Sequence, residues 1–179
     1  MQIMKNSALN SIASQASAFA CARAAIQSRH PPRGNSVTNP EKPRPHTLAG
    51  KCFCGAVQYA VADSFGYAMN CHCSNCRRTT GSAFKPFAGI ERDKFSLTEG
   101  ADKLLIFGEE NGHDAHCQRC GSLLYSLVRD GAFVHVAMGT LVDDPAIRPT
   151  CHIFVGSKAP WFTIADDLPQ YEEHAVASD

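Results

Sequence analysis

Residues 52–55 read CFCG, and residues 117–121 read CQRCG. In each stretch a pair of cysteines can hold one metal ion from a tight turn. The glycine that follows the second cysteine allows the backbone a positive φ, which aims N–H groups at the sulfurs. Two such pairs make a closed tetrahedron of four thiolates, the usual form of a structural zinc site. The sequence therefore predicts that one zinc ion ties the first hairpin to a distant one, with these ligands: Cys52, Cys54, Cys117 and Cys120.

Residues 71–76, CHCSNC, lie between the two pairs and offer three thiolates from one short segment. Three protein ligands with an open position are how catalytic zinc is built. Two alternatives would close this site. His72 could be a fourth ligand, although in an extended segment it points away from both neighbours, and Cys151 or His152 could arrive from a distant part of the chain. The expected ligands of this second, catalytic-type zinc are Cys71, Cys73 and Cys76.

Three thiolates would leave a bound Zn²⁺ with a net negative charge. The pKa of a water on that zinc should therefore lie above the ~7 found with three histidines. A thiolate-rich site accommodates another sulfur better than it generates hydroxide. The cluster thus predicts a thiol substrate, or polarisation of a small carbonyl, rather than hydrolysis of peptides or phosphates. No Ser-His-Asp arrangement or carboxylate pair stands out, so no general base is assigned.

The charge of the chain is divided unevenly, although the formal net charge is zero. Residues 1–46 carry six basic side chains against one acid, whereas the remainder holds eleven basic and sixteen acidic side chains. A nucleic-acid binder normally clusters Lys and Arg on its surface, so no nucleic-acid partner is expected. No run approaches the ~18 apolar residues of a membrane span, so no membrane partner is expected either.

The chain is expected to divide into three segments. Residues 1–46 are predicted to be a flexible extension. Its first thirty residues are Ala- and Ser-rich without an acid, as transit peptides are, and residues 31–46 hold five prolines, as linkers do. A disordered tail or a wrongly assigned start codon is the alternative. A zinc-binding domain is predicted over residues 47–174, with a tail over 175–179. Because thiol ligands survive best in a reducing compartment, we expect a cytoplasmic protein, or a mitochondrial one if the extension directs it there.

The domain is predicted to be all-β. No long segment shows a clean helical period, and Ser74–Thr80 is expected to form one helical turn that stops at Gly81. Short runs of β-branched and aromatic residues, most of them bracketed by Gly, Asp or Pro, are typical of strands. Strands are predicted at residues 56–62, 84–90, 103–107, 123–128, 133–138 and 151–155.

Five further side chains have competing interpretations. Arg77 and Arg78 follow the three-cysteine cluster and could bind a substrate carboxylate or a thiolate, or could form a solvated basic turn. Trp161 and Phe84 could line a pocket but are more often core residues in a small β domain. His135 is expected to be a surface histidine or one with a satisfied hydrogen bond.

The order CxCG, then CxCxxCRR followed by GSAF, then CxxCG, resembles the glutathione-dependent formaldehyde-activating enzymes and their relative, centromere protein V. The C-terminal stretch agrees as well, from CHIFV at 151–155 through APW at 159–161 to DDLPQY at 166–171. The likeness covers roughly Thr47 to His174. These motifs are specific because four separate segments agree in order and spacing.

The resemblance implies a β-tent of short antiparallel sheets, organised by a structural zinc and with little helix. It assigns the two cysteine sets to two zinc ions per chain. It also implies a carbon–sulfur lyase-type enzyme that combines glutathione and formaldehyde into S-hydroxymethylglutathione or acts on a related thiol adduct. The expected partners are therefore a small thiol such as glutathione and a small aldehyde.

Three other functions are compatible with this resemblance. The chain could be a non-catalytic zinc module for protein or chromatin association, or a carrier of glutathione or formaldehyde. Methionine sulfoxide reduction on a similar β-tent would need a reactive cysteine outside the metal sites, for which Cys151 is the candidate.

Overall fold

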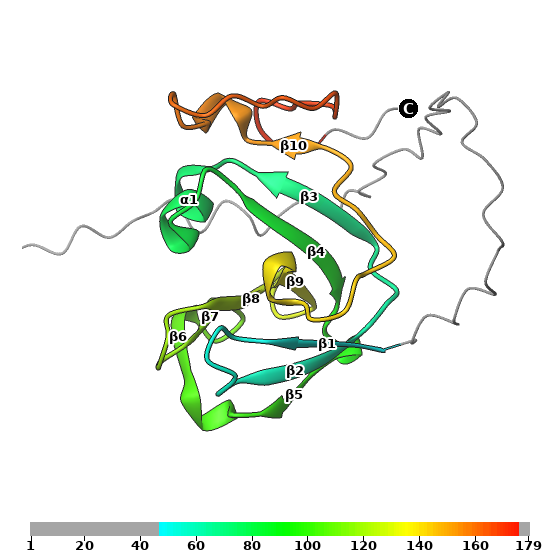
Figure 1. The fold of residues 1–179 in the computed structure, drawn as a ribbon, viewed down its shortest axis with the longest axis vertical. Coiled ribbons are helices and arrows are strands. Elements are labelled where there is room, and N and C mark those ends of the chain that lie inside the picture. Colours follow the sequence, from blue (N-terminus) through cyan, green and yellow to red (C-terminus); the bar gives the residue numbers. More distant parts are fainter. Residues whose placement is uncertain (1–46, 176–179) are drawn as a thin grey trace, which may run out of the picture.

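The computed structural model describes residues 47–175. The extension predicted over 1–46, with its targeting alternative, and residues 176–179 of the predicted tail lie outside this part of the chain. The described residues form two β-sheets and one α-helix, α1, at Ser74–Thr80 (Figure 1). The predicted all-β fold with little helix is confirmed. No helix in the described part is long and apolar enough to cross a membrane.

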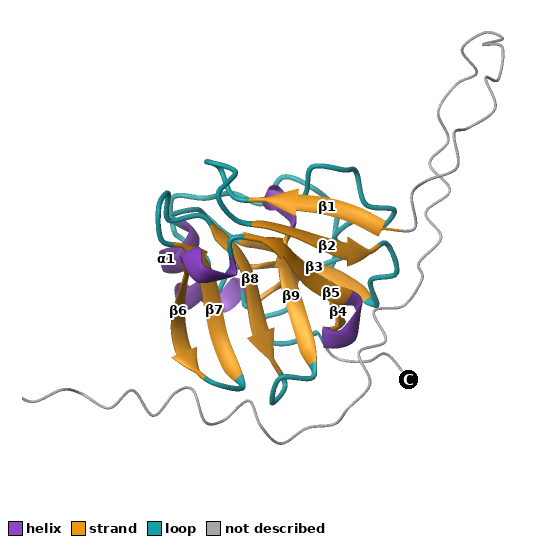
Figure 2. Ribbon diagram, turned by 90° about the horizontal axis from the view of Figure 1, so that it is seen from below, coloured by secondary structure: helices purple, strands orange, loops and turns teal. Residues whose placement is uncertain are grey.

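A three-stranded sheet has the order β1-β2-β5, and a seven-stranded sheet has the order β10-β3-β4-β9-β8-β7-β6. Strands of the two sheets run at a steep angle to each other (Figure 2). All neighbouring strands pair antiparallel except β10, which pairs parallel with β3. The strands are β1 Thr47–Lys51, β2 Gln58–Ala62, β3 Tyr67–Cys71, β4 Lys85–Glu91, β5 Phe95–Glu99, β6 Leu104–Glu109, β7 Gly112–Cys117, β8 Leu123–Val128, β9 Phe133–Ala137 and β10 His152–Ile153.

The main core lies between the two sheets. Buried and partly exposed residues alternate along β2 and β9, as expected for strands with one face against a core. Tyr59 and Val61 from the small sheet pack with Ile90, Val134 and Val136 from the large one. Their alternation explains why β2 and β9 could be recognised from the sequence.

A second, smaller core lies on the opposite face of the seven-stranded sheet. It contains Tyr67, Met69, Phe87 and Ile153, packed with the C-terminal segment that follows β10. In Figure 1 this segment lies beside β3, on the side of the molecule away from the small sheet. Because α1 follows β3 directly, the three-cysteine segment lies at the end of this face.

All six predicted strands are present, with shifted ends in most cases. The strand at 123–128 is β8 without change, whereas only His152–Ile153 of the last predicted strand is paired. The predicted turn over Ser74–Thr80 is α1, and Gly81 ends it in the left-handed conformation. Four strands were not predicted: β1, β3, β5 and β7.

Candidate metal centres

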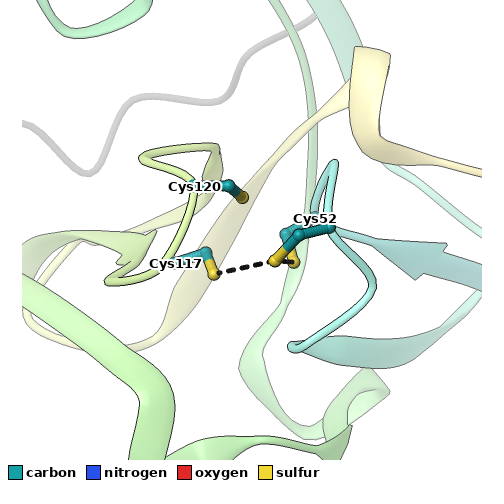
Figure 3. A group of neighbouring side chains, drawn as sticks. Cys52, Cys117 and Cys120 are labelled. Carbon is teal, nitrogen blue, oxygen red and sulfur yellow. Dashed lines mark hydrogen bonds between the residues drawn. The ribbon is translucent and has the colours of Figure 1, made fainter.

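The structure brings the two cysteine pairs together at one point. The first pair follows β1, and the second begins at the end of β7. Their four sulfurs lie within 4.8 Å of one another, and Cys52, Cys117 and Cys120 point to a common centre (Figure 3). The Sγ atom of Cys54 lies 3.6 Å from that of Cys52 and 3.8 Å from that of Cys117. A tetrahedral zinc with ~2.3 Å bonds requires sulfurs roughly 3.8 Å apart, so the four-cysteine cluster fits zinc.

Both turns of the four-cysteine cluster have the backbone that a thiolate site needs. Gly55 and Gly121 have φ of 73° and 76°, and the N–H of Val57 donates to Cys52 Sγ at 3.3 Å. The Ser122 hydroxyl, 3.3 Å from Cys120 Sγ, lowers the pKa of that thiol to about 5. These donors favour thiolates, which is the form that binds a metal.

The three-cysteine cluster is built from one short segment. Cys71 ends β3, Cys73 caps the N-terminus of α1, and Cys76 lies in its first turn. Their sulfurs also lie within 4.8 Å of one another. The thiols of Cys71 and Cys76, together with the backbone N–H of Cys76 at 3.3 Å, hold the pKa of Cys73 far below its usual range. The cluster is therefore suited to a cation, with one side of a tetrahedron left without a protein sulfur.

None of the alternative fourth ligands joins this cluster. Among the described residues, the group that the structure brings together holds only the three cysteines. Cys151 is buried in the second core, and the rings of His72 and His152 face each other, with Nε2 of His72 2.7 Å from Nδ1 of His152. Neither His72 nor Cys151 or His152 therefore completes a four-ligand site at this cluster.

His72, His152 and Asp166 form a chain that sequence reasoning missed. The N–H of Leu168 and the ring of His152 lower the pKa of Asp166, which lies 3.0 Å from Nε2 of His152. An ionised carboxylate only accepts, so His152 donates to it from Nε2, and its Nδ1 shares the second hydrogen bond with Nε2 of His72. The remaining ring nitrogen, Nδ1 of His72, is buried and has no hydrogen-bond partner. Burial also lowers the pKa of His72 to about 4.

Lys85 is a second residue that the sequence did not reveal. It begins β4, directly opposite Cys71 on β3, and is only 6% exposed. Its Nζ donates to Ser126 Oγ at 2.9 Å, and Ser126 donates to Asp114 at 2.5 Å. Asp114 also accepts a bond from Thr79 on α1 at 3.4 Å. A polar row thus runs across the sheet from the three-cysteine cluster to β7.

The two arginines after the cluster differ in their surroundings. Arg77 is half-buried, and its Nε donates to the backbone carbonyl of His72 at 3.3 Å. Arg78 is exposed to solvent. Arg77 therefore supports the backbone of the cysteine segment, and the buried cation near the cluster is Lys85.

The aromatic side chains near the site are placed differently from one another. Trp161 is 72% exposed, so its assignment to the core is wrong. Phe84 is partly buried, with its ring centre 5.2 Å from that of His72. His135 shares a 2.8 Å hydrogen bond with the hydroxyl of Tyr67, as expected for a satisfied histidine.

Comparisons with known proteins assign the chain to a family. The family model described as "Glutathione-dependent formaldehyde-activating enzyme" matches residues 47–157. A relative from Halomonas elongata is 29% identical over 135 residues, which are 65% of this chain and 80% of the relative. A relative from Fusarium vanettenii is 32% identical over 82 residues, 45% of this chain and 44% of the relative.

A relative from Penicillium rubens is 30% identical over 123 residues, 62% of this chain and 62% of the relative. All three carry the name glutathione-dependent formaldehyde-activating enzyme with a provisional qualifier. The chain thus spans less than two thirds of the two fungal relatives and most of the bacterial one.

Proposed function

Since the chain belongs to the glutathione-dependent formaldehyde-activating enzyme family, we propose that it is a zinc-dependent enzyme that joins a small thiol to a small aldehyde. Glutathione and formaldehyde are the proposed pair, and S-hydroxymethylglutathione is the product. In the reverse direction the same reaction is a carbon–sulfur lyase step. The observation that carries the proposal is the three-cysteine cluster, which offers three sulfurs within 4.8 Å and leaves a place for one more ligand.

Cys71, Cys73 and Cys76 would hold the reactive zinc ion. A zinc ion on three thiolates supplies a soft Lewis-acid site that favours a thiolate sulfur over hydroxide. A separate interaction positions each of these ligands. Pairing of β3 with β4 holds Cys71, the N-cap bond holds Cys73, and the Thr80 hydroxyl donates to the carbonyl of Cys76 at 2.7 Å. The ligands are therefore positioned before a substrate arrives, which favours catalysis.

The proposed reaction balances without an oxidant or a reductant. The thiol loses its proton, and its sulfur forms a bond to the aldehyde carbon. The carbonyl π pair moves to oxygen, which then takes up one proton to become the hydroxyl of the adduct. The described residues show no carboxylate or serine placed as a general base at the cluster, so we assign none.

The four-cysteine cluster would hold the second zinc ion in a structural role. All four of its ligands come from the protein, which leaves no position for a substrate. It joins segments that are far apart in the sequence, at the first hairpin and at the end of β7. Cofactor use is thus proposed as two zinc ions per chain with different tasks.

Exchange NMR on glutathione and formaldehyde tests the proposed reaction, because it follows the interconversion of free and adduct forms directly. We expect the zinc-loaded protein to speed the exchange above its spontaneous rate. Cys73→Ser should return it to that rate while the far-UV circular dichroism stays unchanged. Cys21→Ser is the matched control, because Cys21 belongs to neither cysteine cluster and precedes the domain that holds both, so the exchange rate should be kept.

Two results would contradict the proposal. If glutathione binds and the rate does not change, the chain is a carrier. If no thiol binds to zinc-loaded protein, the non-catalytic association module takes its place.

A further inference from the structure

A hollow of about 380 Å³ lies beside the second cysteine turn and the end of α1. It is lined by Thr79 and Thr80 at the end of α1, Lys85 at the start of β4, and Cys120 and Ser122 in the second cysteine turn. Small-molecule sites commonly measure ~300–1,000 Å³, so the hollow is large enough for part of a small substrate. The hollow adjoins α1, the helix that carries Cys76, and Lys85 in its wall pairs with Cys71 of the three-cysteine cluster.

Lys85 brings an incompletely paired positive charge to the wall of this hollow. Removing an ammonium group from water is costly unless hydrogen bonds or an opposite charge replace the lost hydration. Among residues 47–175, no carboxylate lies within salt-bridge distance of Lys85. Among the described residues, Ser126 is the one hydrogen-bond acceptor of Nζ, and the ring of Phe87 lies 5.8 Å from it, so no carboxylate balances this charge directly.

The surroundings of Lys85 fix the direction of its side chain. Ser126 donates its proton to Asp114, so the lone pairs of its oxygen are free to accept from Nζ. The end of the neighbouring strand β9 and the turn that follows it offer small residues at this point, Ala137 and Gly139, which also line the hollow. The side chain can therefore extend along the sheet from β4 toward β8.

The charge of Lys85 acts on both the hollow and the metal ligands. Lys85 is opposite Cys71 in the β3–β4 pairing, which places its charge next to the three-cysteine cluster. Three thiolates around a divalent ion have a net negative charge and would repel an anionic thiol. A buried ammonium beside them offsets this repulsion, because Coulomb energies are larger away from bulk water.

We propose that this hollow is the subsite for the carboxylate of the thiol substrate, and that Lys85 is the residue that binds it. The assignment rests on the proposed function, because it takes the three-cysteine cluster as the place of the substrate sulfur. Thr79 and Ser122 also line the hollow, but their hydroxyls already bond to Asp114 and Cys120, so Lys85 is the group that a carboxylate would meet. A neutral aldehyde has no comparable need for a buried cation, so the site selects among thiols.

A matched pair of thiols tests this subsite. 3-Mercaptopropionate and 3-mercaptopropionamide carry the same sulfur and differ in one charge. By isothermal titration calorimetry on the zinc-loaded full chain, we expect the acid to bind roughly tenfold tighter or more, as a charge-assisted hydrogen bond allows. Lys85→Met should lower the affinity for the acid to that for the amide, and the affinity for the amide should stay unchanged. Lys94→Met is the control, since Lys94 pairs with Glu91 at the surface, and it should keep the wild-type ratio.

The outcomes separate this inference from the function on which it rests. If wild type binds both thiols equally, or if Lys85→Met still prefers the acid, the carboxylate subsite at Lys85 is wrong. The proposed binding of the thiol at the three-cysteine cluster is not contradicted by that result. If neither compound binds, the proposed function fails, and the subsite fails with it. If Lys85→Met does not fold, the ¹⁵Nζ resonance of Lys85 in wild type provides the test. We expect this resonance to shift when the acid is added and not when the amide is added. Equal shifts would overturn the proposal.

Discussion

His135 makes folding stability depend on pH. Its ring stacks on Phe87 with centroids 4.2 Å apart and shares the hydrogen bond with Tyr67. Burial, together with the charges of Lys85 and Arg129, holds the pKa of His135 well below 6.5. In the unfolded chain this ring takes up a proton near pH 6.5, and in the folded chain it does not. The free energy of unfolding should therefore fall as the pH drops below about 6.5.

Replacing His135 with glutamine tests that linkage. Gln keeps a hydrogen-bonding group for Tyr67 and does not titrate. We expect the free energy of unfolding of His135→Gln to fall less than that of wild type between pH 7.5 and 5.5, measured by urea denaturation at matched zinc content. Both proteins have the same cysteines, so acid effects on the metal ligands cancel in the difference. Identical pH slopes would show that His135 is protonated in the folded protein.

At the scale of single residues, sequence reasoning could identify the cysteines and not their neighbours. The cysteine sets were grouped from spacing alone, because chelation by a tight turn is a local property. Lys85 and Ser126 are 41 positions apart, and His72 and His152 are 80 apart. Such contacts depend on strand order and register, which no local pattern contains. For Trp161 the core was the more frequent place of an aromatic residue in a small β domain and a pocket the alternative, whereas the C-terminal segment leaves its side chain exposed.

At the scale of elements, patterns with a single buried face were recognisable and others were not. β2 and β9 alternate and were predicted, as was β8 from its short apolar run. All five residues of β3 are buried, so it lacks the alternation of a half-exposed strand. β7 has the sequence GHDAHC, whose polar side chains are not typical of a strand. Its place between β6 and β8 is a tertiary property.

The end of α1 depends on one glycine. Gly81 has φ of 62° and ψ of 28°, and its N–H donates to the carbonyl of Arg77. A Cβ added there would meet no atom within 4 Å, so Gly81→Ala tests backbone strain without a steric clash. We expect Gly81→Ala to lower the free energy of unfolding by about 1 kcal/mol.

Gly81→Asn is the matched variant, because asparagine tolerates the left-handed conformation better than alanine does. Its loss of stability should be the smaller of the two, as measured by urea denaturation of zinc-loaded protein. An equal or larger loss for asparagine would mean that contacts other than the backbone conformation decide the stability of this turn.

At the scale of the whole molecule, residues 47–175 should fold without the segment that precedes them. They contain both cysteine clusters and both cores. A chain that starts at Thr47 should therefore bind as much zinc and unfold at the same urea concentration as the full chain, within experimental error. Elemental analysis and urea denaturation measure these quantities. A truncated protein that loses zinc would show that the domain boundary predicted at residue 47 is wrong.

The two cysteine clusters should contribute unequally to stability, because they join different lengths of chain. Cys54 and Cys117 are 63 positions apart, so metal bound there ties distant hairpins together, and its binding energy is folding energy. The other cluster lies within residues 71–76, which pairing of β3 with β4 and the cap of α1 already position. Structural zinc contributes roughly 10–16 kcal/mol in small zinc domains, which matches or exceeds the ~5–15 kcal/mol stability of a typical domain.

We therefore expect Cys52→Ser to be unfolded at 25 °C and Cys73→Ser to keep its circular dichroism spectrum. Elemental analysis should find about two zinc ions in wild type and about one in Cys73→Ser. A chelator should remove one ion from wild type before the spectrum changes, because an open site releases its metal more readily than a closed one. If wild type holds a single ion, or if Cys73→Ser unfolds as readily as Cys52→Ser, the division into a structural and a reactive centre is wrong, because stability would then depend on both clusters alike.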